Sequence, residues 1–319
     1  MKTLKKTLIL LFVGLISIGF AQDLDEAGVA FNDGNTAYKS KDYVSAIESY
    51  KSSIDMCQLI GADGAELQTK VEAQIVKAYW KNAVKLYKGK KFDAAVAEMK
   101  KTQEAAKVAN NAKYEKYAAM YIPKIYSSKG LGLYTDKKYD DAIVAFEEAL
   151  GYNDKCVDAF FGMGLTFKEK EDIDAALANF DKAIANGAGN KKAEKNVTKA
   201  KSAAQGMLVA NGAKELQIEH TQKAIDYFTK AQTYGDISGS SYYYLALAYN
   251  KQKKSDDAIA AAKAGIALGG DVSDLQFELA KAYEAKGDTA NACTAYKAVT
   301  TGPNVKAAAF QAKEVLKCN

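Results

Sequence analysis

One pattern of small and bulky residues returns seven times along this 319-residue chain. It is clearest where YDDAIVAFEEAL, which begins at Tyr139, is followed 34 residues later by IDAALANFDKAI, which begins at Ile173. The fourth residue of both stretches is small, and the same position recurs at Ala46, Ala95, Ala142, Ala176, Ala224, Ala258 and Ala292. Seven copies in one register indicate a repeated structural unit.

Two further positions keep a constant distance from this alanine. Four residues after it the chain has Tyr50, Met99, Phe146, Phe180, Phe228, Ala262 and Tyr296. Twelve residues before it the chain has Gly34, Ala83, Gly130, Gly164, Gly212, Ala246 and Ala280. Small residues at two positions let two helix backbones approach closely, while the bulky residue fills the space between neighbouring units.

These offsets resemble the tetratricopeptide repeat, a helix-turn-helix unit of 34 residues. In the stretch YYYLALAYNKQKKSDDAIAAAKAGI, the family's four positions on the first helix are filled by Tyr242, Leu245, Ala246 and Tyr249. The resemblance covers roughly residues 25–303. It implies an all-α, right-handed superhelical solenoid of about seven repeats with a C-terminal capping helix. Composition agrees, since 48% of residues are apolar, only two are proline, and no strand-like alternation occurs.

The chain is expected to divide into three segments. Residues 1–21 have Lys2, Lys5 and Lys6 before an apolar run from Leu8 to Phe20, which is typical of a signal peptide; the alternative is a permanent anchor helix. Residues 22–303 form the solenoid, and 304–319 form the capping helix. The repeats are expected near 27–60, 76–109, 123–156, 157–190, 205–238, 239–272 and 273–303.

Three repeat spacings exceed 34 residues, by 15, 13 and 14. The extra residues fall between the second helix of one repeat and the first helix of the next. Their sequences favour helix, so we expect lengthened helices that raise one edge of the solenoid. The alternative is tolerated variation in loop length. Pro123, within one insert, is expected to kink or start a helix.

Charge and residue content argue against catalysis and nucleic-acid binding. The formal charge of +5 includes the three signal lysines, which leaves +2 after cleavage, and the chain has no arginine. The one histidine, His220, is expected in an exposed turn. The acidic pairs beginning at Asp140 and Asp256 suit the first turn of a helix. We therefore predict no enzymatic activity, no metal site and no cofactor.

Four cysteines are too few for a disulfide-built scaffold. Cys293 occupies a position that is isoleucine in other repeats, and Cys318 ends the capping helix expected to pack on that repeat. Either a Cys293–Cys318 bridge fastens the cap, or both residues are buried free thiols. Cys57 and Cys156 lie two repeats apart and are not expected to meet.

The family resemblance implies that a partner lies along the first helices of the repeats, on the concave face. The residues that this register assigns to partner binding are Phe31, Asn35, Tyr38, Trp80, Val84, Tyr87, Leu131, Tyr134, Phe161 and Leu165. Aromatic residues with a polar group are common binding hot spots. The alternative for Tyr38 and Trp80 is that they fill core space. The two-carboxylate clamp of some relatives is not carried over, because Phe31 replaces its first lysine and no arginine completes it.

The resulting hypothesis is a non-enzymatic interaction scaffold of the cell envelope that binds an extended segment or a helix of a protein partner. The alternative is a structural component that self-associates in an envelope assembly. The protein is expected to be exported, either periplasmic, associated with the outer membrane, or secreted, with no membrane span after signal cleavage. The partner itself is not specified by these patterns.

Overall fold

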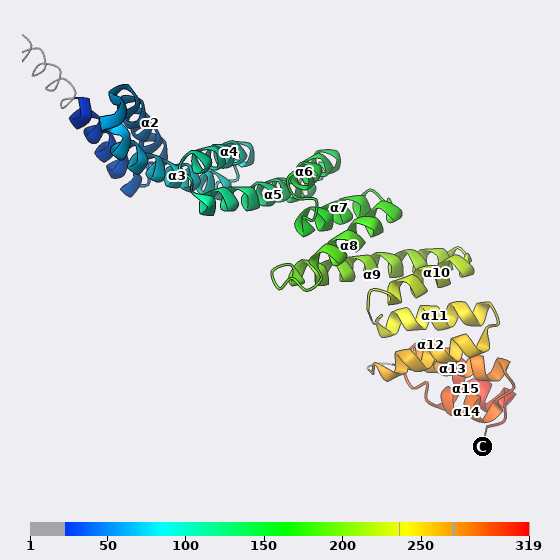
Figure 1. Ribbon diagram of the computed structural model, residues 1–319. Coiled ribbons are helices and arrows are strands. Elements are labelled where there is room, and N and C mark those ends of the chain that lie inside the picture. The colour runs from blue at the N-terminus through cyan, green and yellow to red at the C-terminus, as the bar shows by residue number, and fades with distance from the viewer. Residues whose placement is uncertain (1–22, 236, 270–271, 319) are drawn as a thin grey trace, which may run out of the picture. The chain divides into compact units, whose positions relative to one another are not determined.

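The computed structural model describes residues 23–235, 237–269 and 272–318, and every regular element in these ranges is helical (Figure 1). The predicted all-α fold is therefore confirmed. The predicted signal peptide, residues 1–21, lies outside the described residues. Within the described ranges, no helix is both long and apolar enough to span a bilayer. The chain divides between Met163 and Gly164 into two compact units.

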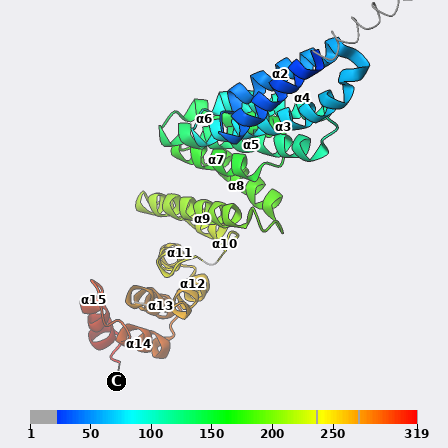
Figure 2. The same ribbon diagram turned by 90° about the vertical axis from the view of Figure 1, so that its left-hand side faces the viewer.

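The first unit is a stack of helices in chain order (Figure 2). α3 packs against α2 and α4, and α5 packs against α4 and α6. The elements are a helix over residues 23–39, α2 (Tyr43–Ile60), the 3-10 turn η1 (Gly61–Gly64), α3 (Ala65–Lys88), α4 (Phe92–Val108), α5 (Ala112–Thr135), α6 (Tyr139–Tyr152) and the first half of α7 (Val157–Glu169).

The second unit continues the same alternation of packed helices from the second half of α7. Its elements are α8 (Ile173–Gly187), α9 (Glu194–Gln217), α10 (Thr221–Gln232), α11 (Gly239–Lys251), α12 (Ser255–Ala267), α13 (Ser273–Ala285), α14 (Thr289–Lys297), α15 (Val305–Phe310) and the π-helical turn η2 (Gln311–Val315).

Seven hairpin turns in the described ranges share one backbone conformation. Each contains one residue with positive φ, and these are Lys41, Lys90, Lys137, Glu171, Glu219, Lys253 and Gly287. The N–H of the following residue donates to the carbonyl five residues earlier, as from Asp172 to Phe167 at 3.0 Å and from Asp288 to Tyr283 at 2.9 Å. This is the Schellman closure of a helix end. Its recurrence shows that seven helix pairs are built alike.

The small residue of the first helix touches the bulky residue of the second. A Cβ placed on Gly34 would lie 2.5 Å from the ring of Tyr50, and one placed on Gly164 would lie 2.5 Å from the ring of Phe180. Both rings are fully buried, and the repeated alanine is 0% exposed in all seven copies. The predicted repeat register is therefore confirmed within each unit. The right-handed twist of the whole array stays a prediction.

The three inserts form lengthened helices, as predicted. α3, α5 and α9 each have 24 residues, against 13 for α7, α11 and α13. The preceding helices α2 and α4 are also long, with 18 and 17 residues, against 13 for α12. The first two inserts thus add turns to both arms of a hairpin, whereas the third lengthens only α9, since α8 has 15 residues and α6, which no insert follows, has 14.

Pro123 lies inside α5, so the expectation that it starts a helix is wrong. A proline removes one backbone hydrogen bond from a helix interior. Here eleven residues of α5 precede it, and their side chains pack against α3, which offsets the missing bond. Helix α5 therefore begins at Ala112, in the insert, and not at the proline.

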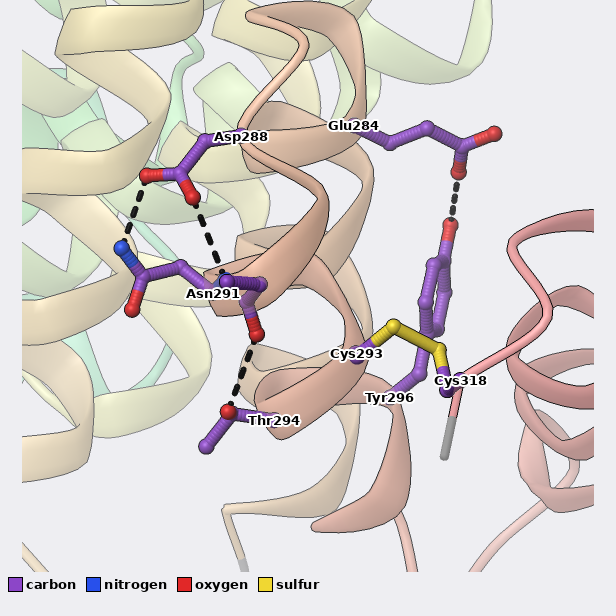
Figure 3. Close-up of a disulfide and its surroundings, with 8 residues drawn as sticks. Glu284, Asp288, Asn291, Cys293, Thr294, Tyr296 and Cys318 are labelled. Atoms are coloured by element: carbon purple, nitrogen blue, oxygen red, sulfur yellow. Dashed lines mark hydrogen bonds between the residues drawn. A yellow bond between two sulfur atoms is a disulfide. The ribbon is translucent and has the colours of Figure 1, made fainter.

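The C-terminal cap packs on the last hairpin, with Ala308 and Ala312 buried in the core beside Tyr296. Its α-helical part ends at Phe310 and continues as the π-helical turn, in which the Leu316 N–H donates to the Gln311 carbonyl at 2.9 Å. In the structure a disulfide joins Cys318 to Cys293 on α14, with a Cα–Cα distance of 5.6 Å (Figure 3). Cys57 and Cys156 are buried free thiols.

Candidate partner-binding surface

The ten residues assigned to partner binding lie on the first helices of four hairpins. Three are on the helix over 23–39, three on α3, two on α5 and two on α7. Leu131 is 36% exposed, and the other nine side chains are half-buried. Nine of the ten belong to the first unit, while Leu165 belongs to the second. The first unit therefore carries most of the predicted surface.

In the first hairpin, two of the predicted residues contact the buried ring of Tyr50. The Phe31 ring lies 5.9 Å from it, and the Asn35 side-chain oxygen accepts a hydrogen bond of 2.9 Å from the Tyr50 hydroxyl. Burial raises the pKa of Tyr50 to about 12, so this hydroxyl stays protonated and donates. Asn35 therefore contributes to the core as well as to the surface.

Trp80 stands at the centre of an aromatic cluster that was not predicted. Its ring centroid lies 4.8 Å from Tyr121, 5.5 Å from Tyr117 and 6.1 Å from Tyr114. All three tyrosines are on the inserted half of α5 and are half-buried. Edge-to-face contacts of this kind add to the apolar burial of the rings. Trp80 therefore fastens the inserted half of α5 to α3, besides reaching the surface.

Tyr38 belongs to the same neighbourhood. Burial, followed by the nearby phenols of Tyr114 and Tyr43, raises the pKa of Tyr38. Its ring meets that of Tyr43 edge-on at 5.6 Å. The first hairpin and the α5 insert thus place their aromatic side chains close together, although almost eighty residues separate them in the chain.

The remaining predicted residues of α3 and α5 are held by local contacts. The Tyr87 hydroxyl lies 2.8 Å from the Ser128 hydroxyl, and the Tyr87 ring packs beside Phe92 at 6.3 Å. The Tyr134 ring packs beside Tyr139 at 6.1 Å. Val84 lines the core of the second and third hairpins, and Leu131 is the most open of the set.

Three lysines lie over the rings of this cluster. Lys85 is 6.0 Å from the Tyr43 ring, Lys113 is 5.8 Å from Tyr117, and Lys124 is 5.3 Å from Tyr121. In the described part of the chain, none of the three has a carboxylate oxygen within ion-pair distance. α3 carries five lysines and two glutamates, and α5 carries four lysines and one glutamate, so both helices are basic.

We call the set Tyr38, Tyr43, Trp80, Tyr114, Tyr117, Tyr121, Lys85, Lys113 and Lys124 the aromatic–lysine face. The tyrosines of α5 follow a helical spacing of three and four residues, at 114, 117 and 121. That spacing could have shown that they share a helix face. It could not have shown that they meet Trp80, because the repeat pattern does not extend into the inserts.

The residues considered as candidates for catalysis, His220 and the acidic pairs at Asp140 and Asp256, lie in turns and helix starts where their positions have a structural explanation. His220 follows the positive-φ residue of its turn, and its Nδ1 lies 2.8 Å from one carboxylate oxygen of Glu215. Lys223 donates a hydrogen bond to the other oxygen of the same carboxylate. Asp140 and Asp256 lie in the first turns of α6 and α12. Over residues 23–235, 237–269 and 272–318, no group of three histidine, cysteine or acidic residues could hold a metal ion.

Two stretches of the chain, residues 128–191 and 243–306, match a family model described as tetratricopeptide repeat. No curated protein matches the chain. The solved structures that resemble it include the MamA protein, at 21% identity over 60% of this chain and 95% of that one, with a TM-score of 0.35.

Two further similar structures are those of YrrB and of a domain of yeast Sti1. YrrB, described as having an unusual peptide-binding site, is 16% identical over 60% of this chain and 88% of its own, with a TM-score of 0.36. The TPR2AB domain of yeast Sti1, in complex with pHSP90, is 17% identical over 77% of this chain and 97% of its own, with a TM-score of 0.30.

Proposed function

We propose that this chain, a tetratricopeptide-repeat protein, is a non-enzymatic scaffold of the cell envelope that binds a protein partner through the aromatic–lysine face of its first unit. The observation that carries the proposal is the arrangement of Lys85, Lys113 and Lys124 over half-buried rings, with no ion pair to any of these lysines among the residues that the structure describes. Stability alone does not require this arrangement, because lysines on a solvated helix gain more from paired acidic neighbours.

The chemistry of the face selects the class of partner. Half-buried tyrosine and tryptophan rings offer apolar area with little loss of side-chain entropy on binding. The lysine ammonium groups attract carboxylates as point charges, and the chain has no arginine for a bidentate contact. We therefore expect an acidic segment of a partner that also carries apolar side chains, lying as an extended strand or a helix along α3 and α5.

The cell-envelope setting follows from the sequence of residues 1–21. A lysine-rich start, a short apolar run and small residues before Gln22 favour export through a cleaved signal peptide. The protein would then be periplasmic, associated with the outer membrane, or secreted. A partner in the same compartment would meet the aromatic–lysine face without crossing a membrane.

Crosslinking from α5, the helix that carries much of the face, tests this function. A photoreactive amino acid in place of Leu131, which is 36% exposed, should form an adduct with one envelope protein in intact cells. The same residue in place of Leu268, which is 51% exposed and lies in the second unit, is the control. Adducts of the same protein from both positions, or from neither, would contradict a partner site on the first unit.

Self-association is the second candidate, and it is favoured by exposed apolar residues at the extended hairpins. Leu59 near the end of α2 is 87% exposed, and Val108 at the end of α4 is 64% exposed. Sedimentation velocity of the mature protein over a hundredfold range of concentration distinguishes the two functions. A monomer throughout supports the scaffold, and concentration-dependent growth that Leu59→Gln abolishes supports the assembly.

A further inference from the structure

The outward face of the first helix, over residues 23–39, carries an apolar residue surrounded by acidic ones. Val29 is 59% exposed, and the exposed residues Asp25 and Asp33 lie one helical turn before and one turn after it. Glu26, three residues before Val29, is exposed as well. None of these three carboxylates has an ion pair among the residues that the structure describes. The face is therefore apolar at its centre and negatively charged around it.

This face of the first helix points away from the residues assigned above to partner binding. Ala27 and Phe31, two residues before and two after Val29, face α2. The Ser53 hydroxyl donates to the Ala27 carbonyl at 2.7 Å, and the Phe31 ring lies 5.9 Å from that of Tyr50. Two residues of an α-helix correspond to roughly 200° of rotation, so Val29 faces the opposite way.

The outward face of the C-terminal cap has the same arrangement with the opposite charge. Phe310, the last residue of α15, is 59% exposed, and it is the one exposed phenylalanine among the described residues (Figure 1). Lys306 lies four residues before it and Lys313 three residues after it, both exposed. Neither lysine has an ion pair in the described ranges. Ala308 and Ala312 are buried on the core side of the cap, which places Phe310 on the outward side.

The stability of a single copy does not account for these two faces. The terminal units of a stacked-repeat protein ordinarily present a polar outer face, which keeps them soluble, whereas here both faces have an apolar centre. The helix dipole favours acidic residues in a first turn, but Asp33 lies about two turns further along its helix. A contact between the two faces removes both apolar side chains from water and brings opposite charges together.

We propose that the first helix of one copy of this chain binds the cap of a second copy. Phe310 of one copy then packs on Val29 of the other, and the lysines of the cap pair with the carboxylates around Val29. An apolar centre with a charged rim is the ordinary anatomy of a protein–protein interface. The charges also fix the direction of the contact, because two first helices repel each other and so do two caps.

The contact is head to tail, because its two halves are different surfaces. Each copy that joins leaves one first helix and one cap free, so the assembly can grow into a chain of copies. The disulfide between Cys293 and Cys318 holds the cap face in place, since it joins the end of the chain to α14. The proposal uses neither the aromatic–lysine face nor Leu59 and Val108, so it stands apart from both functions proposed above.

Sedimentation velocity of the mature, oxidised protein over a hundredfold range of concentration tests the contact. The weight-average sedimentation coefficient should rise with concentration at about 0.05 M sodium chloride and rise less at about 0.5 M, where the charges are screened more strongly. Phe310→Gln should remove this rise. Leu268→Gln is the matched control, since Leu268 is 51% exposed elsewhere in the second unit, and it should leave the rise unchanged.

Exchanging the charges of the two faces gives the sharper test. Lys306→Glu with Lys313→Glu makes both faces acidic, and a second variant with Asp25→Lys, Glu26→Lys and Asp33→Lys makes both basic. Each variant alone should stay a monomer and should keep the circular dichroism spectrum of the parent protein. An equimolar mixture of the two should assemble again, because each face of one variant is complementary to a face of the other.

A parent protein that stays monomeric over the whole range overturns this proposal and leaves the scaffold function standing. Growth that Phe310→Gln does not reduce also overturns it, and so does growth that only Leu59→Gln abolishes, which points to the extended hairpins instead. A mixture of the two charge variants that stays monomeric contradicts it as well. Because both charge variants keep Phe310, the mixture decides the matter even if Phe310→Gln perturbs the cap.

Discussion

A Cβ on Gly130 would lie 2.5 Å from a ring carbon of Phe146, which is closer than two non-bonded carbon atoms can approach. The ring of Phe146 is fully buried, and a Cβ on Gly162 in the next hairpin would meet the same ring at 2.2 Å. The ring therefore lies between two helix backbones that carry no side chain at the contact. This contact links the small and bulky positions of the repeat.

Gly130→Ala is expected to destabilise the first unit. The added methyl group overpacks a filled core and should lower the free energy of unfolding by about 1–3 kcal/mol, although alanine favours helix. Gly132→Ala is the matched control on the same helix, since a Cβ there meets nothing within 4 Å. Thermal melting followed by circular dichroism should show a lower midpoint for Gly130→Ala and an equal or higher one for Gly132→Ala. Equal shifts would contradict the packing.

The hairpin turns offer a stabilising substitution. Lys137 has a φ of 59°, a conformation that costs a residue with a side chain about 1 kcal/mol and costs glycine almost nothing. Lys137→Gly should therefore raise the melting midpoint of the protein slightly. Gly287→Ala makes the reverse change at the equivalent turn, where φ is 76°, and should lower it. A decrease for both variants would show that the turns are not equivalent.

Trp80→Ala is expected to reduce stability as well as partner binding. The substitution removes a half-buried ring that contacts three tyrosines of α5, and we expect a loss of roughly 2 kcal/mol, below the usual cost for a fully buried tryptophan. Amide hydrogen exchange should locate the effect, with faster exchange over residues 112–121 than over 125–135. Uniformly faster exchange along α5 would argue against a specific anchor.

Two helix-capping aspartates predict sensitivity to acid. Hydrogen bonds from the side chain and backbone of Ser45 lower the pKa of Asp42, and the same contacts from Asn291 lower the pKa of Asp288. Because the folded pKa lies below the ordinary value of 3.8, the contribution to stability is complete above that value and is lost as pH falls through the folded pKa. Ser45→Ala should weaken this acid dependence without removing the Asp42 carboxylate.

The measurement for the aspartates is the melting midpoint at pH values from 7 to 2. The melting midpoints of Ser45→Ala and of the parent protein should differ most near neutral pH. They should converge at the acid end, where the Asp42 carboxylate is protonated in both proteins. A difference that grows toward low pH would mean that the sign of the linkage is wrong.

Reduction of the disulfide is expected to loosen the cap. A link that closes a loop of 25 residues stabilises a fold by about 3 kcal/mol in the chain-entropy description. Dithiothreitol should therefore lower the melting midpoint of the second unit. The Cys318→Ser variant should already show this lower midpoint and should not respond to the reductant. A response in that variant would point to another target.

The repeat register and the helical inserts could be predicted because they depend on local spacing. Alanine and aromatic positions at fixed offsets specify which faces of two helices touch, as Gly164 and Phe180 do. The seven positive-φ turns were not predicted, since six of them use lysine or glutamate where glycine would have been the signal. For Pro123 the expected helix start was wrong, because its local preference is overridden by packing of the helix around it.

The candidate surface was predictable only in part. The family register assigned Trp80 and Tyr38 to the surface, and both side chains are half-buried. It could not show that Tyr114, Tyr117 and Tyr121 surround Trp80. The shared hydrogen bond of Asn35 with Tyr50 also lies outside any helix-face argument, because it joins two helices through side-chain length and rotamer. Contacts of this kind need coordinates.

The aromatic–lysine face is tested most directly by the affinity of the partner captured at Leu131 for a variant with Lys85→Glu, Lys113→Glu and Lys124→Glu. These lysines form no ion pair in the described part of the chain, so the variant should fold with an unchanged circular dichroism spectrum. We predict at least a hundredfold weaker binding, about 3 kcal/mol, for three reversed charges facing an acidic segment. Unchanged affinity in a folded variant would contradict the proposed function.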